Sequence, residues 1–293
     1  MGWWHPERTR LPQRRLRRAI PLAGFVVLAS ALTGCSTDTQ WERFGMPEIT
    51  TVQGEHILHL WQGAWIAALV TGVITWALII GVPIWFRRRS DDEVPVQTRY
   101  NLPIEIFYTI FPVIMVIAFF SQTVRVQNVA LEHVEDPDVV VTVVGQKWQW
   151  TFNYPHDGEN VFVSGTGDDI PQLVIPVDKT IEFELYSPDV IHNFGIPAFA
   201  MRMDVVPGNN NSYQVTPTEI GVYDGKCYEL CGAYHSRMLF TVAVVSEADY
   251  EAYLDDLAAS EDTSSDEPIK GGKYAEELIT TGEHDDEHEG GHE

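Results

Sequence analysis

Two long runs without a charged side chain dominate the pattern of hydrophobic and polar positions. The first extends from Ile57 to Phe86 and the second from Ile106 to Val124. A helix over the thirty residues of the first run would measure about 45 Å, whereas the hydrocarbon core of a bilayer is about 30 Å thick. The second run is close to the minimum length for a span. We therefore expect two transmembrane helices, over residues 57–86 and 106–125.

Basic residues indicate the orientation of this helical hairpin. Arg87, Arg88 and Arg89 directly follow the first run, and basic residues at the end of a membrane helix favour the cytoplasmic side. The connection over residues 87–105 is therefore expected inside the cell. Everything after residue 125 is then expected outside.

The N-terminal segment has the pattern of a bacterial export signal. Six arginines lie within residues 8–18, and an uncharged apolar run follows over residues 19–32. The run ends in Leu-Thr-Gly before Cys35, which resembles the lipobox of bacterial lipoproteins. We expect a signal peptide over residues 1–34, lipidation of Cys35 and an extracytoplasmic segment over residues 35–56. An uncleaved signal anchor with an incidental cysteine is the alternative.

After Pro137 the long apolar runs give way to short β-rich stretches separated by Pro, Gly, Asp or Asn. This pattern predicts a Greek-key β-sandwich or barrel over residues 132–258. A short helix from Glu247 to Leu257 is expected to close it. The expected strands are Val139–Val144, Trp148–Tyr154, Leu173–Val177, Thr180–Tyr186, Ser212–Thr216 and Leu239–Val245.

The end of the chain, residues 259–293, is acidic and low in complexity. It holds twelve acidic residues against Lys270 and Lys273. Such a segment lacks the apolar area that would offset the entropy of ordering, so we expect it to be disordered or fixed only by a partner. Three histidines lie four residues apart, at positions 284, 288 and 292. In a helix they could bind an adventitious metal ion, but a solvated acidic tail is the favoured interpretation.

The net charge limits the possible partners. The chain carries 19 basic and 42 acidic side chains, a formal net charge of −23. A surface of this sign repels nucleic acid phosphates and attracts cationic partners at moderate ionic strength. We therefore expect no binding to nucleic acid.

The candidate chemistry is concentrated near the end of the predicted β-domain. Cys227, Cys231, His235 and Met238 place two thiols, an imidazole and a thioether within twelve residues. Soft sulfur with imidazole is a ligand set that copper prefers. One more imidazole is expected from an upstream strand, and His192 is well placed to supply it.

Three other uses of these residues are possible. A disulfide between Cys227 and Cys231 is chemically allowed outside the cell, but it gives His235 and Met238 no purpose. Structural zinc could bind the two cysteines with His192 and His235, but it has no use for Met238. A mononuclear copper site needs only one cysteine, so the second indicates two metal ions that share bridging thiolates.

The segment from Gly221 to Met238 closely resembles the CuA loop of cytochrome c oxidase subunit II, and the resemblance extends over about Ile57 to Val245. It implies a two-helix transmembrane hairpin followed by a cupredoxin-like Greek-key β-sandwich, with two copper ions as cofactor. The implied copper ligands are the bridging thiolates of Cys227 and Cys231, His192 and His235 with one on each ion, Met238 as a weak axial ligand, and the backbone carbonyl of Glu229.

Further matches to the same family imply roles for single residues. The side chain of Glu229 would face a magnesium ion at the border with subunit I. Trp148 matches the residue through which electrons enter, beneath the docked donor. Glu105 matches a residue at the cytoplasmic mouth of a proton-uptake path in the catalytic subunit. Without the resemblance, Trp148 is simply a large β-sheet side chain and Glu105 an interfacial carboxylate.

The resemblance thus implies subunit II of a bacterial haem–copper cytochrome c oxidase in the plasma membrane, with its copper domain on the extracytoplasmic face. Such a subunit accepts electrons from cytochrome c, or from a haem c domain of a neighbouring complex. It relays them to haem in subunit I, where oxygen is reduced to water and protons are pumped. Other oxidase subunits are expected partners. The alternatives are a quinol oxidase subunit II, which would lack the copper ligands, and a copper-delivery protein, which would not need the hairpin or Glu105.

Overall fold

The computed structural model describes residues 40–94, 97–165, 169–260 and 262–271. Cys35 and the predicted signal peptide lie outside these residues, as do residues 272–293. Residues 1–45 form one unit and residues 46–293 a second. Of the first unit the structure describes only a turn, in which the Gly45 amide donates to the carbonyl of Gln40.

Two long apolar helices, α2 (Val52–Trp85) and α3 (Leu102–Ala130), are long and apolar enough to cross a membrane. Each starts about one turn before the predicted span, because a polar residue caps it. The hydroxyl of Thr51 accepts a hydrogen bond from the Gly54 amide at 3.1 Å. Such caps satisfy amides that have no partner inside the helix. The two predicted apolar helices are thus confirmed.

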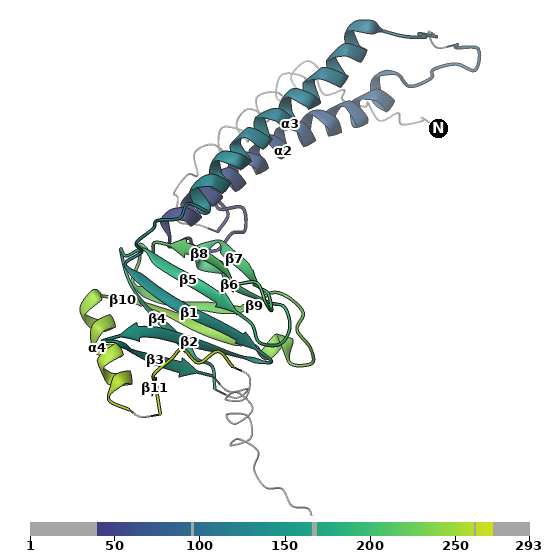
Figure 1. The fold of residues 1–293 in the computed structure, drawn as a ribbon. Coiled ribbons are helices and arrows are strands. Elements are labelled where there is room, and N and C mark those ends of the chain that lie inside the picture. The colour runs from purple at the N-terminus through teal and green to yellow at the C-terminus, as the bar shows by residue number, and fades with distance from the viewer. Residues whose placement is uncertain (1–39, 95–96, 166–168, 261, 272–293) are drawn as a thin grey trace, which may run out of the picture. The chain divides into compact units, whose positions relative to one another are not determined.

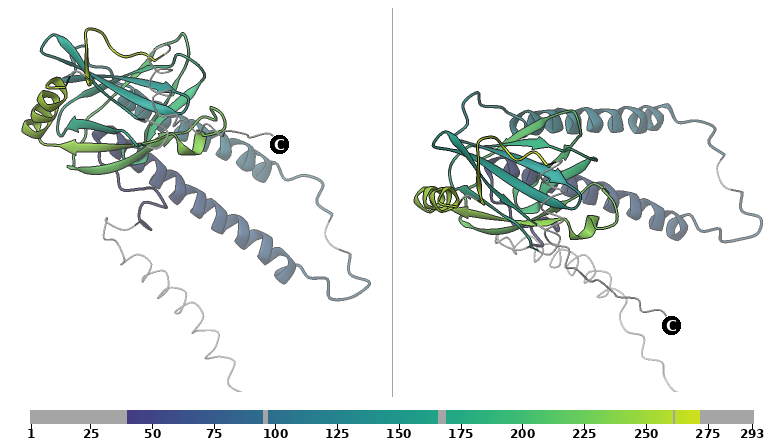
Figure 2. Two further views of the ribbon diagram at one scale, coloured as in Figure 1. Left: turned by 90° about the horizontal axis from the view of Figure 1, so that it is seen from below. Right: turned by 60° about the horizontal axis from the view of Figure 1, so that its bottom comes forward.

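The remainder of the second unit is a sandwich of two β-sheets (Figures 1 and 2). The six-stranded sheet has the order β11 (Ser264–Ser265), β3 (Glu159–Ser164), β2 (Gln149–His156), β1 (Val139–Gln146), β5 (Ile181–Tyr186), β8 (Asn211–Val215). The five-stranded sheet has the order β4 (Gln172–Pro176), β10 (Leu239–Val245), β9 (Gly221–Cys227), β6 (His192–Ile196), β7 (Met201–Val205). Two short 3₁₀ helices, η1 (Pro197–Phe199) and η2 (His235–Arg237), lie in the connections.

Aromatic side chains fill the space between the sheets. On β2, Trp150, Phe152 and Tyr154 alternate with outward-facing residues and are fully buried, as expected for a strand with one face on the core. Phe194 on β6 and Phe240 on β10 stack with their ring centroids 4.7 Å apart. Aromatic pairs of this kind contribute more than the area they bury.

The helix α4 (Glu247–Ala258) packs against β2, β3 and β4, as Figure 2 shows from two sides. The hydroxyl of Ser246 caps it by accepting a hydrogen bond from the Asp249 amide. Its buried face carries Tyr250 and Leu254, and Tyr250 meets Tyr154 edge-on. The predicted closing helix is therefore confirmed.

Two differences from the sequence prediction concern strands. Strands β3, β6, β7 and β9 were not predicted, because their polar and glycine residues hide the apolar alternation. In addition, residues 262–271 were expected to be disordered, but β11 within them pairs with β3. The prediction of disorder is therefore wrong for residues 262–271.

Gly225 tests how tightly the core is packed. A side chain on this glycine would overlap the ring of Phe240, and the site is buried. We expect Gly225→Ala to lower the free energy of unfolding by about 1–3 kcal/mol, the usual effect of overpacking. Denaturant unfolding of the detergent-solubilised chain measures this. The exposed neighbour Asp224 is the control, and Asp224→Ala should change the free energy by less than about 0.5 kcal/mol; equal effects would contradict the packing account.

Candidate metal centre

The predicted ligands converge at one end of the five-stranded sheet. His192 is the first residue of β6 and Cys227 the last residue of β9. Phe194 pairs with Cys227 across these strands. The amide of Cys227 also donates to the carbonyl of Met238 at 3.0 Å. The loop from residue 228 to 237 therefore leaves and rejoins the sheet at one point, which brings its ligands back to His192.

The donor atoms form a connected cluster. The two sulfurs Cys227 Sγ and Cys231 Sγ are 3.9 Å apart. His192 Nδ1 lies 3.9 Å from Cys227 Sγ, and His235 Nδ1 lies 3.5 Å from Cys231 Sγ. Met238 Sδ is 3.8 Å from Cys231 Sγ. The structure thus brings together all the side chains that the sequence predicted as copper ligands.

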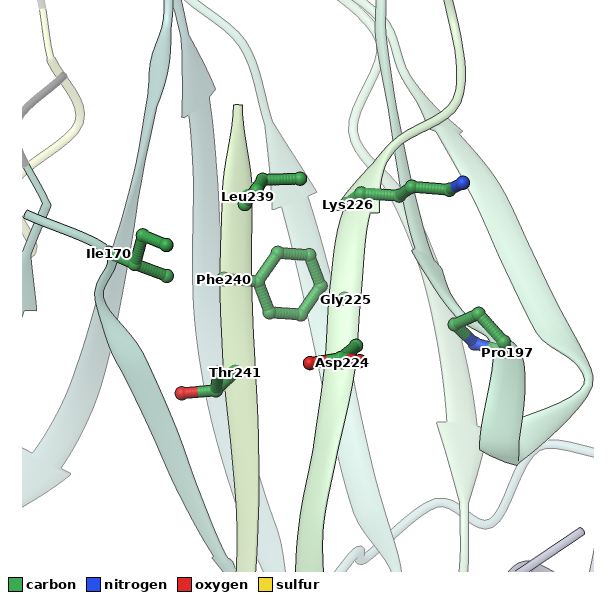
Figure 3. Close-up of a pocket in the computed structure, with 8 residues that line it drawn as sticks. All are labelled: Ile170, Pro197, Asp224, Gly225, Lys226, Leu239, Phe240 and Thr241. Carbon is green, nitrogen blue, oxygen red and sulfur yellow. The ribbon is translucent and has the colours of Figure 1, made fainter. Parts of the chain in front are cut away.

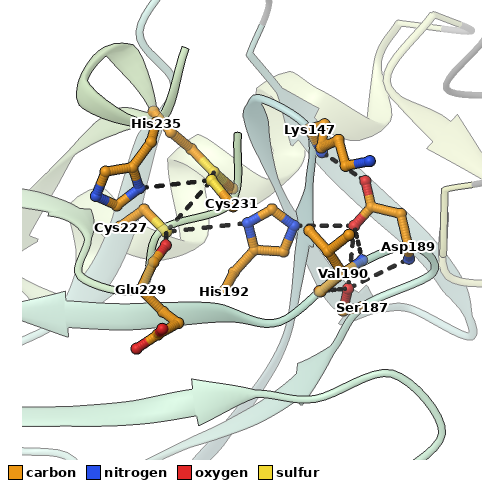
Figure 4. Close-up of polar contacts among 10 residues, drawn as sticks. Lys147, Ser187, Asp189, Val190, His192, Cys227, Glu229, Cys231 and His235 are labelled. Atoms are coloured by element: carbon orange, nitrogen blue, oxygen red, sulfur yellow. Dashed lines mark hydrogen bonds and ion pairs between the residues drawn. The ribbon is translucent and has the colours of Figure 1, made fainter. Parts of the chain in front are cut away.

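These separations fit shared metal ions. Thiolate and imidazole donors lie about 2.0–2.3 Å from a bound ion, so two donors on one ion are at most about 4.6 Å apart. His192, Cys227 and Cys231 form a compact group, with ligand atoms within 4.8 Å of one another. His235 does not belong to that group, and Figure 4 shows the two imidazoles on opposite sides of the cysteine pair. The cluster is therefore elongated.

The cluster is shielded from water. His192 and Met238 are fully buried, and both cysteines are nearly so. The indole of Trp150 forms one wall, with its ring centroid 6.2 Å from that of His192. Its Nε1–H donates to the Met238 carbonyl at 3.4 Å. Both thiols and the His192 imidazole therefore lie in a medium of low dielectric constant, where electrostatic interactions are strong, whereas His235 is partly exposed.

Asp189 orients His192, a role that sequence reasoning did not assign. Its Oδ1 lies 2.9 Å from His192 Nε2, so that Nδ1 of the ring faces Cys227 (Figure 4). The carboxylate also accepts hydrogen bonds from the amides of Lys147 at 2.9 Å and Val190 at 2.6 Å. A carboxylate on the far nitrogen of a ligating histidine fixes its tautomer. An Asp three residues before the histidine was the sequence signal.

The pKa values reflect this pairing. Burial opposes ionisation of Asp189, but hydrogen bonds from His192, Lys147 and Val190 outweigh it and lower the pKa to about 2. Burial would likewise lower the pKa of His192, yet its bonds to Asp189 and Cys227 raise it. Each shift in pKa thus favours the charged form of its side chain, so the contact between Asp189 and His192 becomes an ion pair where His192 is protonated.

The two cysteines differ. Burial raises the pKa of each thiol, but in Cys227 hydrogen bonds from His192 and from the backbone reverse the effect and lower the pKa. In Cys231 burial and the neighbouring Cys227 act together and raise the pKa to about 12. A metal that binds both sulfurs as thiolates therefore has to displace the proton of Cys231.

Two further predicted residues lie beside the cluster. The Glu229 carbonyl is 3.3 Å from Cys227 Sγ, while its exposed carboxylate points away from the sulfurs (Figure 4). Trp148 packs on the metal loop: its ring meets that of Tyr234 edge-on at 5.0 Å, and a side chain on Gly232 would lie 3.0 Å from it.

Glu105 has a local structural role. Its Oε1 accepts a hydrogen bond from the Asn101 amide at 2.8 Å, and Asn101 Oδ1 in turn accepts one from the Ile104 amide. This reciprocal arrangement caps the first turn of α3. The carboxylate thus stabilises the helix start, whatever else it does.

A pocket of ≈ 420 Å³ lies on β9 and β10 (Figure 3). Its residues Lys226 and Leu239 adjoin two predicted ligands in sequence, but it contains none of the ligands. The candidate metal centre is thus a packed site distinct from this pocket. The pocket is lined by Ile170, Pro197, Asp224, Gly225, Lys226, Leu239, Phe240 and Thr241.

Comparison with known proteins bears on the family. Residues 139–245 match the family "Cytochrome C oxidase subunit II, periplasmic domain". "Probable cytochrome c oxidase subunit 2" of Streptomyces avermitilis is 43% identical over 288 residues, which cover 85% of this chain and 90% of that protein. The chain belongs to the cytochrome c oxidase subunit 2 family. "Cytochrome c oxidase subunit 2" of Mycobacterium tuberculosis is 33% identical over 303 residues, with 83% and 82% covered.

Solved structures overlap more weakly. The periplasmic domain of subunit II of cytochrome oxidase (CoxB) of Bradyrhizobium japonicum has a TM-score of 0.40 and 28% identity, covering 43% of this chain and 98% of that chain. A heme-copper terminal oxidase dimer has a TM-score of 0.30 and 16% identity, covering 63% and 98%.

Membership of the subunit 2 family confirms the predicted family and makes the chain a subunit of cytochrome c oxidase. It implies other oxidase subunits as partners and a copper centre in the sandwich domain. The His192, Cys227 and Cys231 group is the candidate for that centre among the described residues. The donor set fits copper, since two soft thiolates and imidazoles converge in a buried site.

Asp189→Asn tests the orienting role. Loss of the carboxylate leaves the His192 ring less well fixed, and partners of this kind are worth about 10–100-fold in metal affinity. We expect faster loss of copper to a chelator by about that factor. Asp224→Asn, on an exposed residue of β9, should leave the rate unchanged. Equal rates for the Asp189 variant and the native chain would refute the role.

The same substitution has a pH signature in the metal-free chain. The folded pKa of Asp189, about 2, lies below its ordinary value of 3.8. The stabilisation is therefore complete above the ordinary value and is lost as the pH falls toward the folded value. Thermal midpoints between these two pH values should fall in the native chain and change less in Asp189→Asn.

Proposed function

We propose that this chain is the electron-accepting subunit of its oxidase. It takes electrons from a cytochrome c-type donor at a dinuclear copper centre and relays them to haem in subunit I, where oxygen reduction is coupled to proton pumping. The observation that carries the proposal is the connected cluster of two thiols, two imidazoles, a thioether and a carbonyl.

The elongated cluster supports two ions in place of one. A single tetrahedral ion would draw both imidazoles and both sulfurs into one compact group. Here His192 lies at the Cys227 end, and His235 and Met238 lie at the Cys231 end. Two ions would use every donor: Cys227 and Cys231 would hold both ions, and His192 and His235 would each bind one.

The protein's part is to keep this geometry constant. Bound copper would supply a one-electron acceptor and donor. Asp189 fixes the His192 ring, and the Cys227–Met238 backbone bond closes the loop on the sheet. Trp150 and the buried position exclude water. A site whose ligands do not move between oxidation states has little to reorganise when an electron arrives.

Trp148 is proposed as the residue through which electrons enter. It packs against Gly232 and Tyr234 of the metal loop and is partly exposed. Its indole Nε1 is buried and finds no hydrogen-bond partner within the described part of the chain. The support for this role is therefore the direct contact of the Trp148 ring with the loop that carries the predicted ligands.

The remaining roles follow from the family resemblance. We place the protein in the plasma membrane of a bacterium, spanning it with α2 and α3 and exposing the copper domain outside, with lipid on Cys35. The net charge of −23 suits a cationic donor, either cytochrome c or a haem c domain of a neighbouring complex. The exposed Glu229 carboxylate would bind magnesium at the border with subunit I, and Glu105 would stand at the mouth of a proton path.

Loss of one bridging thiolate tests the proposal. Cys227→Ser or Cys231→Ser in the full chain should abolish oxidase turnover and reduce copper from about two ions per chain to one or none. In the native protein, electron spin resonance should show an unpaired electron shared over both nuclei. Ser236→Ala, on an exposed residue of the same loop, is the control. One copper with a four-line spectrum in the native chain, or full activity in either serine variant, would sink the proposal.

Trp148→Phe tests the entrance separately. The smaller ring keeps an aromatic contact but loses the indole, so electron transfer from reduced cytochrome c should slow about tenfold, roughly 1.4 kcal/mol in activation free energy. The copper spectrum should stay the same. Trp41→Phe is a matched control, because Trp41 is exposed in the first unit. A native rate in Trp148→Phe would place the entrance elsewhere.

A further inference from the structure

The segment from residue 262 to 271, which we name the C-terminal strap, lies on the outer face of the six-stranded sheet. It begins with β11, which pairs with β3, and in Figure 1 it is the yellow line that crosses β2. The Phe162 amide donates to the carbonyl of Thr263 at 2.8 Å, and Asn160 Nδ2 donates to Ser265 Oγ at 3.0 Å. The strap is therefore tied to the edge of the sheet at its start.

Asn153 pins the middle of the strap. Its Nδ2 donates to the Ile269 carbonyl at 3.1 Å, and its Oδ1 accepts from the Ile269 amide at 2.7 Å. One side-chain amide thus reproduces both bonds of a β-ladder. Asn153 lies on the outward face of β2, yet it is only 1% exposed. A polar residue buried this completely needs its partners, so the strap is part of the folded domain.

The end of the strap reaches the two loops that hold Asp189, the hydrogen-bond partner of His192. Lys270 Nζ lies over the Tyr186 ring, 5.8 Å from its centroid. Gly271, at φ +79°, has no room for a side chain: a Cβ there would overlap Gln146 and lie 2.9 Å from Pro188. Gln146 ends β1 just before the β1–β2 turn, and Pro188 belongs to the β5–β6 loop.

These two loops meet at Asp189. The turn contributes the Lys147 amide, which donates to Asp189 Oδ2, and the loop contributes Asp189 itself, which holds His192. Gln146 and Pro188 each directly precede one member of this bond in sequence. Gly271 of the strap therefore lies close to residues on both sides of the hydrogen bond that joins the turn to the loop.

We propose that the C-terminal strap is a positioning element of the metal centre: pinned by Asn153, it clamps the two loops together so that Asp189 keeps His192 in its ligand orientation. Turns and loops move more than the strands they connect. Metal ligands keep their geometry only when the residues that contact them are themselves held in place. The strap supplies that support from a part of the chain that follows every ligand in sequence. The relevance to copper rests on the proposed function, but the clamping itself does not.

Hydrogen exchange on the metal-free full chain tests the clamping. Two changes release the strap: Asn153→Ala, and a chain ending at Ser260. Their controls are Asn209→Ala, on an exposed loop, and a chain ending at Gly271, which keeps the strap. We expect the Lys147 and Val190 amides, both bonded to Asp189, to exchange on the order of tenfold faster in the released chains and unchanged in the controls.

The Ile269 amide reports whether Asn153→Ala has freed the strap. If Ile269 loses protection while Lys147 and Val190 keep theirs, the proposal is wrong. If Asn153→Ala does not fold, the chain ending at Ser260 replaces it in the comparison with the controls. Native protection of the Lys147 and Val190 amides in that chain would equally overturn the proposal.

Copper provides the second readout. In the assembled oxidase, the released chains should lose copper to a chelator about 10–100-fold faster than the controls, with altered hyperfine splitting and a shifted reduction potential. If the copper spectrum, the reduction potential and the rate of copper loss are all unchanged, the strap contributes only to the stability of the fold. The positioning role would then be overturned. A native chain that binds no copper pair would instead refute the proposed function and leave the exchange result intact.

Discussion

The packing of Phe240 over Gly225 is the contact on which the metal centre depends. Because β9 carries no side chain at this position, the ring from β10 can cross it and stack on Phe194 of β6. His192 begins β6 and Cys227 ends β9, while Met238 directly precedes the first residue of β10. The absence of a side chain at Gly225 therefore allows the stacked rings of Phe240 and Phe194 to pack across all three strands. The predicted ligands lie at the ends of these strands.

The electrostatics of the cluster follow from its burial. A buried charge is costly unless it is paired or hydrogen-bonded, and the Asp189 carboxylate is hydrogen-bonded to His192 and to two backbone amides. The two neighbouring thiols cannot both ionise easily, so Cys227 has the lowered pKa and Cys231 the raised one. A bound cation removes this conflict, because it compensates both sulfurs at once. The site is thus better satisfied with metal than without it.

The sequence was a good guide wherever a local pattern carries the information. The two apolar helices, the closing helix α4 and the ligand residues in the loop before β10 all follow from patterns within a short window. Assigning His192 required the expectation that a distant strand supplies an imidazole, and the pairing of β6 with β9 confirms that it lies there. The individual ligand roles, the magnesium role of Glu229 and the roles of Trp148 and Glu105 stay predictions.

The sequence was a poor guide where long-range contacts decide. Strands β6 and β9 are rich in glycine and polar residues, and only their neighbours in the sheet make them strands. Residues 262–271 have the composition of a disordered tail, and their order comes from Asn153 and Asn160, more than a hundred residues upstream. Composition describes what a segment can bury by itself. Composition does not show that polar side chains elsewhere in the chain can form hydrogen bonds with the segment.

The place of β10 in its sheet has a consequence for biogenesis. This strand lies between β4 and β9, in the interior of the sheet, although it is the last strand of that sheet in chain order. Until the ribosome has delivered it, β4 and β9 cannot belong to the same sheet, and Met238 cannot reach the cysteines. The ligand cluster can therefore form only when synthesis of the domain is nearly finished, which makes its assembly a late event in the life of the nascent chain.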